Sequence, residues 1–237
     1  MSDKLILALD KPNFSTAKLL IDELQDSINF YKVGLELMAS GDYFTTIEYL
    51  KNKNKKVFAD LKLYDISQTV GKAVANLAKY QIDLLTIHCA SRDIMLRACE
   101  NKGLMKIIGV SVLTNLNQMD LIEMGFDKNL SISELVDKKT ALAIECGVDG
   151  VVASAQEAKS LRSKFGNNFL IVTPGIRLKN DQQIISNDDQ KRTADVELAI
   201  HSGANYLVVG RPITSSDNIK KSAQKFINLI NDFTSNS

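Results

Sequence analysis

The sequence predicts an α/β fold, a single-domain (β/α)8 barrel over residues 1–237, and three observations carry this prediction. Eight short runs rich in leucine or β-branched residues recur along the chain, with stretches of helical spacing between them. These runs are mostly apolar and do not alternate, which is typical of a parallel sheet buried on both faces. A doubly wound open sheet is the alternative, but no Gly-x-Gly-x-x-Gly follows the first run and no Walker-type glycine loop occurs.

The eight predicted strands follow one another from the N-terminus to the C-terminus. They are Leu5 to Leu9, Phe30 to Val33, Val57 to Leu61, Leu84 to His88, Lys106 to Val110, Gly150 to Ala153, Phe169 to Thr173 and Tyr206 to Val209. In a barrel of this kind the active site lies at the C-terminal ends of the strands, and phosphate is commonly held after the seventh and eighth.

The helical stretches between these runs carry signals of their own. The last helix shows the clearest pattern, because its apolar residues repeat at intervals of three and four and form one stripe. The stripe consists of Ile219, Ala223, Phe226, Ile227 and Ile230. Two other helices are predicted to begin at capping boxes, Ser131 with Glu134 and Ser154 with Glu157, which satisfy free amides of the first turn.

Length and composition are those of an ordinary globular domain. Apolar residues make up 45% and charged residues 24%, and with three prolines in the chain no linker is visible. The apolar run near the N-terminus is too short for a secretory signal or a membrane span, so we expect a cytoplasmic protein. A net charge of +1 argues against nucleic acid or a membrane as partner. Three cysteines without a Cys-x-x-Cys pattern predict reduced thiols.

The segment from residue 58 to residue 66 carries the strongest chemical signal. It reads Phe-Ala-Asp-Leu-Lys-Leu-Tyr-Asp-Ile and places two carboxylates around one lysine where an apolar strand ends. Side chains alternate between the faces of a strand, so Asp60 and Lys62 are expected to point the same way, with Asp65 in the loop beyond. A salt bridge at a strand end would explain one such pair, but the polar residues at the other strand ends favour a functional site.

Those polar residues stand at the ends of four further strands. Asp10 closes the first strand, Lys32 ends the second, His88 ends the fourth and Thr114 follows the fifth. For His88 alone, a hydrogen-bonded structural histidine is the better interpretation. Two lysines and three carboxylates at one mouth must balance one another in a partly desolvated place, which is typical of an active site. No metal site is predicted, because a lysine lies among the carboxylates and no His or Asp cluster has ligand spacing.

The ends of the last two strands predict a phosphate site. Thr-Pro-Gly-Ile-Arg at 173–177 ends the seventh strand, and Val-Val-Gly-Arg-Pro at 208–212 ends the eighth, with Asp-Gln-Lys-Arg at 189–192 in the loop between them. Glycine allows the backbone to approach an anion closely, and arginine offers a planar fork that matches phosphate oxygens. Turn geometry would explain either glycine alone. Two strand ends that each carry a glycine and an arginine, after the seventh and eighth strands where this fold commonly holds phosphate, favour phosphate binding.

Taken together, these motifs closely resemble the orotidine 5'-phosphate decarboxylase family. The resemblance covers nearly the whole chain and keeps the family's order, from Ala-Leu-Asp at 8–10 and Lys-Val-Gly at 32–34 to the phosphate motifs. One departure is Ser67-Gln68, where the family usually has Pro-Asn. The resemblance implies a homodimeric barrel that decarboxylates orotidine 5'-monophosphate to uridine 5'-monophosphate and CO2, the last step of de novo UMP biosynthesis, without cofactor or metal.

The resemblance also implies a role for individual residues. Lys62 would donate the proton to C6 of the pyrimidine, flanked by Asp60, Lys32 and Asp65, and Asp65 would reach the active site of the other subunit. The implied substrate-binding residues are Asp10, Lys32, Asp60, Thr69 and Thr114 at the base and ribose, and Arg177, Gln190, Gly210 and Arg211 at the phosphate.

Three other interpretations stay open at this point. A 3-keto-L-gulonate 6-phosphate decarboxylase shares the Asp-x-Lys-x-x-Asp core but requires magnesium, and the phosphate motifs favour the nucleotide enzyme over it. A phosphosugar isomerase or epimerase is disfavoured, because no metal set and no clear acid/base pair for enolisation are visible. A catalytically inactive nucleotide-binding barrel would be expected to have lost part of the charged set, whereas all four members are present.

Overall fold

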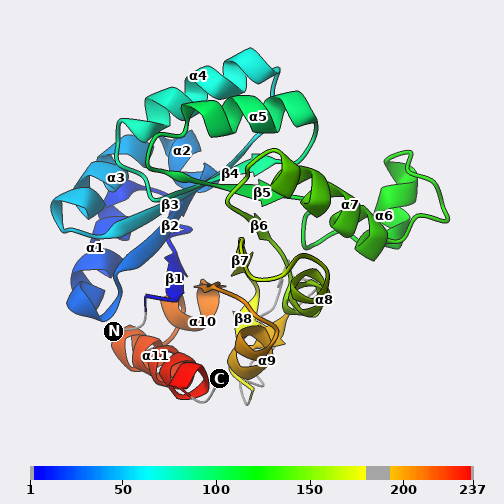
Figure 1. Cartoon of the computed structure of the whole chain (residues 1–237). Coiled ribbons are helices and arrows are strands. Elements are labelled where there is room, and N and C mark those ends of the chain that lie inside the picture. Colours follow the sequence, from blue (N-terminus) through cyan, green and yellow to red (C-terminus); the bar gives the residue numbers. More distant parts are fainter. Residues whose placement is uncertain (1–2, 180–192, 236–237) are drawn as a thin grey trace.

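Figure 1 shows parallel strands at the centre of the molecule with helices arranged around them, in a computed structural model that describes residues 3–179 and 193–235. The barrel strands are β1 (Leu5–Ala8), β2 (Phe30–Gly34), β3 (Lys56–Leu63), β4 (Leu84–His88), β5 (Lys106–Val110), β6 (Gly150–Val152), β7 (Leu170–Thr173) and β10 (Tyr206–Val209). They follow in sequence order around the ring, and β10 pairs with β1 to close it. The predicted (β/α)8 barrel is confirmed, and the strand bounds differ from the predicted ones by at most two residues.

The helices lie between the strands and cover the outside of the barrel (Figure 1). They are α1 (Phe14–Leu24), the 3-10 helix η1 (Gln25–Ser27), α2 (Leu35–Ser40), α3 (Tyr43–Asn52), α4 (Ser67–Ala78), α5 (Arg92–Asn101), α6 (Gln118–Glu123), α7 (Ile132–Glu145), α8 (Ala155–Phe165), α9 (Val196–His201), α10 (Arg211–Thr214) and α11 (Ile219–Ser235). Both predicted capping boxes are present, at the starts of α7 and α8. The predicted stripe of α11 packs on the barrel, with four of its members buried and Ile219 partly buried.

Two apolar layers hold the barrel together. The outer layer lies between the strands and the helices, where the largest cluster of buried side chains is found. The inner layer fills the barrel interior and consists of Ile6, Ala8, Phe30, Phe58, Leu84, Ile108, Val172 and Val208. Burial of one large apolar side chain contributes about 1.5 to 3 kcal/mol. This layer of side chains makes the barrel interior a packed core and not an open channel.

A second, smaller sheet lies beyond β7 and was not predicted. It pairs β8 (Ile176–Arg177) with β9 (Ala194–Asp195) in parallel, so that Arg177 stands opposite Asp195. Strands of two residues carry no periodic signal, which is why the sequence pattern did not reveal them. The pairing matters for the site, because it holds Arg177 in an extended segment at the end of β7.

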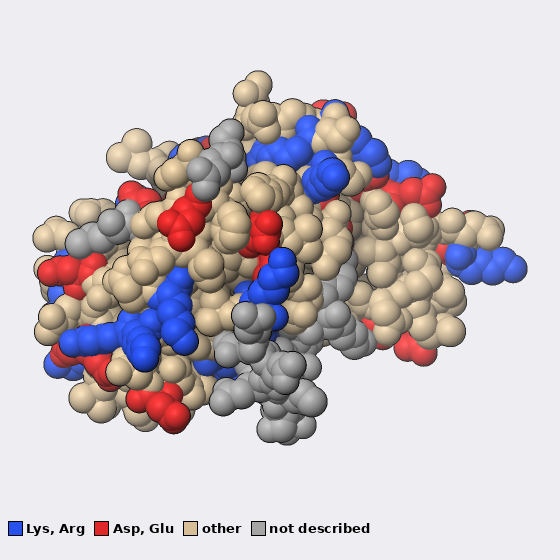
Figure 2. All heavy atoms as spheres, turned by 90° about the horizontal axis from the view of Figure 1, so that it is seen from below, with Lys and Arg blue, Asp and Glu red and all other residues tan. Residues whose placement is uncertain are grey.

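The surface agrees with the near-neutral net charge. Figure 2 shows acidic and basic side chains interspersed over the face seen from below, with groups of Lys and Arg side chains at its left and toward its upper right. Within residues 3–179 and 193–235, no helix combines the length and the apolar character that crossing a bilayer would require.

Candidate active site

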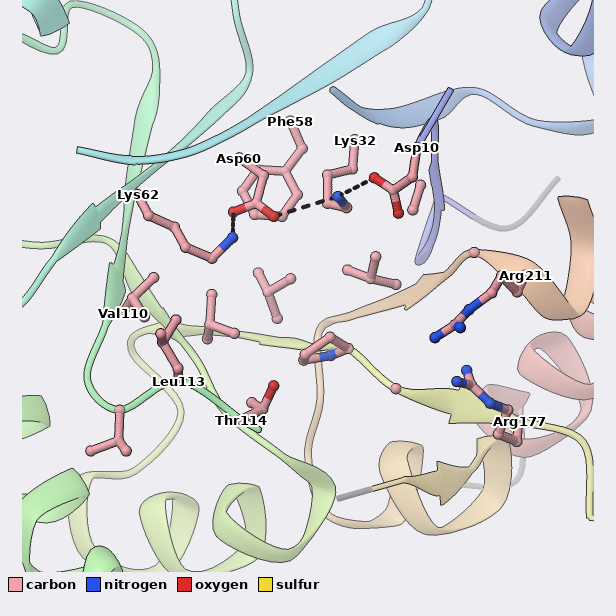
Figure 3. A pocket seen from close by; sticks show the side chains of 18 residues that line it. Asp10, Lys32, Phe58, Asp60, Lys62, Val110, Leu113, Thr114, Arg177 and Arg211 are labelled. Atoms are coloured by element: carbon pink, nitrogen blue, oxygen red, sulfur yellow. Dashed lines mark hydrogen bonds and ion pairs between the residues drawn. The ribbon is translucent and has the colours of Figure 1, made fainter. Parts of the chain in front are cut away.

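A cavity of about 280 Å³ opens at the C-terminal ends of the barrel strands. Charged side chains line one side, apolar side chains line the opposite side, and two arginines stand at one end (Figure 3). The cavity is lined by eight of the predicted site residues, namely Asp10, Lys32, Asp60, Lys62, Thr114, Arg177, Gly210 and Arg211. Residues more than 200 positions apart in the sequence therefore meet in one pocket, as parallel strand ends require.

The charged side is a row of alternating ion pairs. Lys62 Nζ lies 2.8 Å from Asp60 Oδ1, and Lys32 Nζ lies 3.5 Å from Asp60 Oδ2. At the far end of the row, Lys32 Nζ donates to Asp10 Oδ1 at 2.9 Å. Figure 3 shows the order Lys62, Asp60, Lys32 and Asp10 along one wall of the cavity. Each charge in the row has an opposite charge beside it, which offsets the cost of removing these groups from water.

These neighbours keep both central groups charged. Burial alone would raise the pKa of Asp60, but the charges of Lys32 and Lys62 outweigh burial, so this pKa lies below its ordinary value. Burial alone would lower the pKa of Lys32, but the carboxylates of Asp60 and Asp10 outweigh burial, so this pKa lies above its ordinary value. The Asp60 carboxylate and the Lys32 ammonium are thus held ionised at neutral pH opposite the apolar side of the cavity.

The strand that carries Asp60 and Lys62 is not regular. The register of β3 against β4 shifts between Ala59 and Leu63, and Lys62 has a φ of +48°, in the left-handed region. Asp60 and Lys62 point the same way, as predicted. The prediction assumed that side chains alternate along a regular strand, and this assumption was wrong, because the alternation does not hold across the bulge. A lysine in the left-handed region is strained by about 1 to 3 kcal/mol, and such strain is concentrated at functional sites.

One residue that holds this bulge was missed in the sequence. Thr86, in the middle of β4, is fully buried, and its Oγ1 accepts a hydrogen bond from the Lys62 backbone N–H at 2.9 Å. The same hydroxyl lies 3.0 Å from Asp60 Oδ1. Its signal in the sequence is weak, because threonine is common in strands and Thr86 lies in the run Leu-Leu-Thr-Ile-His.

The opposite end of the cavity is cationic. Arg177 on β8 and Arg211 at the start of α10 point toward each other (Figure 3), and Gly210 lies beside them. A Cβ on Gly210 would lie 3.5 Å from Ala8 Cβ, an ordinary van der Waals contact, so packing against β1 does not by itself require glycine here. Two guanidinium groups that face each other repel, and an anion between them relieves that repulsion through charge-assisted hydrogen bonds. This end of the cavity is therefore suited to a phosphate.

Three residues singled out in the sequence, Asp65, Thr69 and His88, do not line this cavity. Asp65 and Thr69 are exposed, and Asp65 Oδ1 accepts a hydrogen bond from the Ile66 N–H at 2.6 Å. His88 packs against the Tyr64 ring, with centroids 5.7 Å apart, and does not line the cavity as we expected of the rim. Gln190 lies outside the described residues, as does the whole Asp-Gln-Lys-Arg motif.

The apolar side of the cavity was also not predicted residue by residue. It consists of Val110, Val112, Leu113, Val152 and Val172, from β5, β6, β7 and the segment after β5. These side chains exclude water and thereby strengthen the electrostatic interactions across the cavity. Over residues 3–179 and 193–235, no group of three or more His, Cys, Asp and Glu side chains is placed to hold a metal ion.

The fold and the site together define a class: a (β/α)8 barrel with a charged row and a cationic end at the strand termini. The chain belongs to the Orotidine 5'-phosphate decarboxylase / HUMPS family, whose model matches residues 3–226. It is 44% identical to the orotidine 5'-phosphate decarboxylase of Methylococcus capsulatus, over 95% of this chain and 90% of that protein. It is 42% identical to the enzyme of that name from Carboxydothermus hydrogenoformans, over 96% and 95% of the two chains.

A solved structure shares the whole architecture. The crystal structure of orotidine 5'-phosphate decarboxylase from Lactobacillus acidophilus superposes with a TM-score of 0.85 at 29% identity. The match covers 97% of this chain and all of that one. The insertions and deletions that separate the two proteins are therefore small.

Proposed function

We propose that this protein decarboxylates orotidine 5'-monophosphate to uridine 5'-monophosphate and CO2, the last step of de novo UMP biosynthesis. The observation that carries the proposal is the row of ion pairs from Lys62 through Asp60 and Lys32 to Asp10, which faces an apolar wall across the cavity. Its relatives of 39–44% identity bear the name of this enzyme and support the same activity.

In the proposed mechanism, the pyrimidine lies beside Lys62 and the bond between C6 and the carboxylate carbon breaks. The electron pair stays on C6, and the fixed Lys62 ammonium stabilises this charge and then transfers a proton from Nζ to C6. Asp60, held by both lysines, would lie next to the substrate carboxylate and disfavour the bound substrate more than the transition state. The products are CO2, the protonated ring carbon and a neutral Lys62 amine, which regains its proton from water.

The remaining substrate groups are assigned along the same cavity. Asp10 and Lys32 would bind the ribose hydroxyls, and Thr114 would contact the base. The phosphate would be held by Arg177, Gln190, Gly210 and Arg211, at a distance from the bond that breaks. Binding energy gained at this remote group can offset the strain of the charged site, so a substrate without phosphate should lose turnover as well as affinity.

We propose further that the protein is a homodimer in which Asp65 completes the site of the partner subunit. Tyr64 and Ile66, on either side of Asp65, are 71% and 72% exposed. Large apolar side chains exposed side by side are typical of a surface that a partner covers. We place the enzyme in the cytoplasm, where its three free cysteines stay reduced.

The test is an absorbance assay that follows the pyrimidine of orotidine 5'-monophosphate in the presence of a chelator. Full activity with the chelator is expected, because protonation by an ammonium group requires no Lewis acid in the proposed mechanism. Activity that disappears with the chelator and returns with magnesium would move the assignment to a sugar-phosphate decarboxylase. Binding of the nucleotide without any turnover would instead identify an inactive nucleotide-binding barrel.

A further inference from the structure

Thr86 on β4 lies opposite the irregular part of β3. The register runs from Ala59 opposite Leu85 directly to Leu63 opposite Ile87. Three residues of β3, Asp60 to Lys62, therefore face the single residue Thr86 on β4. A bulge of this kind removes residues from the regular ladder, so the backbone groups of β3 need other partners here.

The Thr86 hydroxyl supplies one of these partners. Its oxygen accepts from the Lys62 N–H at 2.9 Å, which fixes the residue whose φ is +48°. Its one proton can go to Asp60 Oδ1 at 3.0 Å or to the Ala59 carbonyl at 3.5 Å. The shorter distance and the charge of the acceptor both favour Asp60. The hydroxyl is fully buried, so water cannot replace it if it is removed.

Asp60 Oδ1 thus accepts from two directions, from the Lys62 ammonium at 2.8 Å and from Thr86. These two hydrogen bonds fix the rotation of the carboxylate, while its other oxygen faces Lys32. The same hydroxyl therefore touches both the backbone that aims Lys62 and the carboxylate that holds the Lys62 ammonium.

We propose that Thr86 is a positioning residue for the reaction: its hydroxyl fixes the β3 bulge and thereby sets where the Lys62 ammonium and the Asp60 carboxylate lie. This inference rests on the proposed function and adds a residue that contacts neither the cavity nor the substrate. A residue that only stabilises the fold would change the amount of folded enzyme, whereas a positioning residue changes the rate of each folded molecule.

The test compares Thr86→Val, Thr86→Ser and a matched control. Valine keeps the branched shape and removes the hydroxyl, and serine restores the hydroxyl. The control is Thr140→Val on α7, where the buried hydroxyl finds no hydrogen-bond partner among the described residues. Thr86→Val should lower kcat about tenfold to a hundredfold, because one neutral and one charge-assisted hydrogen bond are lost. KM should change less than about threefold, since the proposed ribose and phosphate contacts of Asp10, Arg177 and Arg211 are untouched.

The pH profile separates positioning from general damage. A donor to the charged form of Asp60 lowers its pKa, so removal of the Thr86 hydroxyl raises that pKa. The low-pH limb of kcat should then move to higher pH in Thr86→Val, stay in place in Thr140→Val and return in Thr86→Ser. Unchanged kcat and an unchanged low-pH limb in folded Thr86→Val would overturn the proposal.

Two further measurements keep the test decisive. If Thr86→Val does not fold, the rates of Thr86→Ser and Thr86→Cys are compared. Cysteine has a size similar to serine, but its thiol is only a weak donor and acceptor. Equal kcat values in these two variants would overturn the proposal. If the wild type does not act on orotidine 5'-monophosphate, the proposed function fails, and crystal structures of Thr86→Val and Thr86→Ser still test the positioning role. A crystal structure of Thr86→Val in which the β3 bulge, Lys62 and Asp60 have not moved would then refute the positioning role.

Discussion

The proposed dimer makes a quantitative prediction about two inactive variants. Asp60 and Lys62 form an ion pair of 2.8 Å within one chain, whereas Asp65 of the same chain is exposed and does not line the cavity. If each site combines Asp60 and Lys62 of one subunit with Asp65 of its partner, Lys62→Ala and Asp65→Ala damage different sites of a mixed dimer. One site of that dimer carries both changes, and the other site is wild type.

The expected recovery follows from two-fold symmetry. Random exchange of equal amounts makes about half of the dimers mixed, and each mixed dimer has one intact site of two, so activity should approach about a quarter of wild type. The assay is the decarboxylation rate after subunit exchange, with exchange itself followed by mass spectrometry of the dimers. A mixture of Asp60→Ala and Lys62→Ala is the matched control, because both residues belong to the same chain's site and no mixed dimer has an intact one. Absence of recovery despite exchange, with both variants folded, would show that Asp65 acts within its own chain or that the sites depend on each other.

The other predictions concern single substitutions at Lys62, Arg211 and Gln190. Lys62→Ala should abolish decarboxylation and keep the fold, since water cannot replace a fixed charge beside the reacting carbon; turnover near wild type would refute the mechanism. Lys62→Gly should be equally inactive but more stable than Lys62→Ala in urea unfolding by about 1 kcal/mol, because glycine adopts a positive φ without strain. Arg211→Ala should lower kcat/KM about tenfold to a hundredfold through loss of a charge-assisted contact to phosphate, and Gln190→Ala should lower it less. Full efficiency in Arg211→Ala would place the phosphate elsewhere.

The fold was predictable because each barrel strand is a short apolar run between helical stretches. A strand such as β4 is buried along almost its whole length, so its sequence departs clearly from the amphipathic pattern of α4 and α5 on either side. The capping boxes at Ser131 and Ser154 were predictable for a different reason, since a cap depends on residues only three positions apart. The sheet of β8 and β9 was not predictable, because each strand has two residues and the two strands are separated in the sequence by residues 178–193.

The site was predictable where it depends on charge and chain order, and not where it depends on an irregular backbone. Asp60 and Lys62 are conspicuous as charges at an apolar strand, and Arg177 and Arg211 as charges beside glycine. The sequence does not predict a bulge at Lys62, because the left-handed region is usually occupied by glycine or asparagine and lysine is not typical of it.

The same irregularity explains why Thr86 could not be found in advance. Threonine is favoured in any strand, and its hydroxyl gains a specific function only because three residues of β3 stand opposite it. The strain at Lys62 costs about 1 to 3 kcal/mol and persists only where surrounding contacts over-determine it. Those contacts are the Thr86 hydrogen bond at the Lys62 backbone and the Asp60 ion pair at its side chain, so the groups that hold the strain are the ones that place the ammonium. The position of the Lys62 ammonium is therefore set by β3 and β4 together, and a substitution in either strand should shift it.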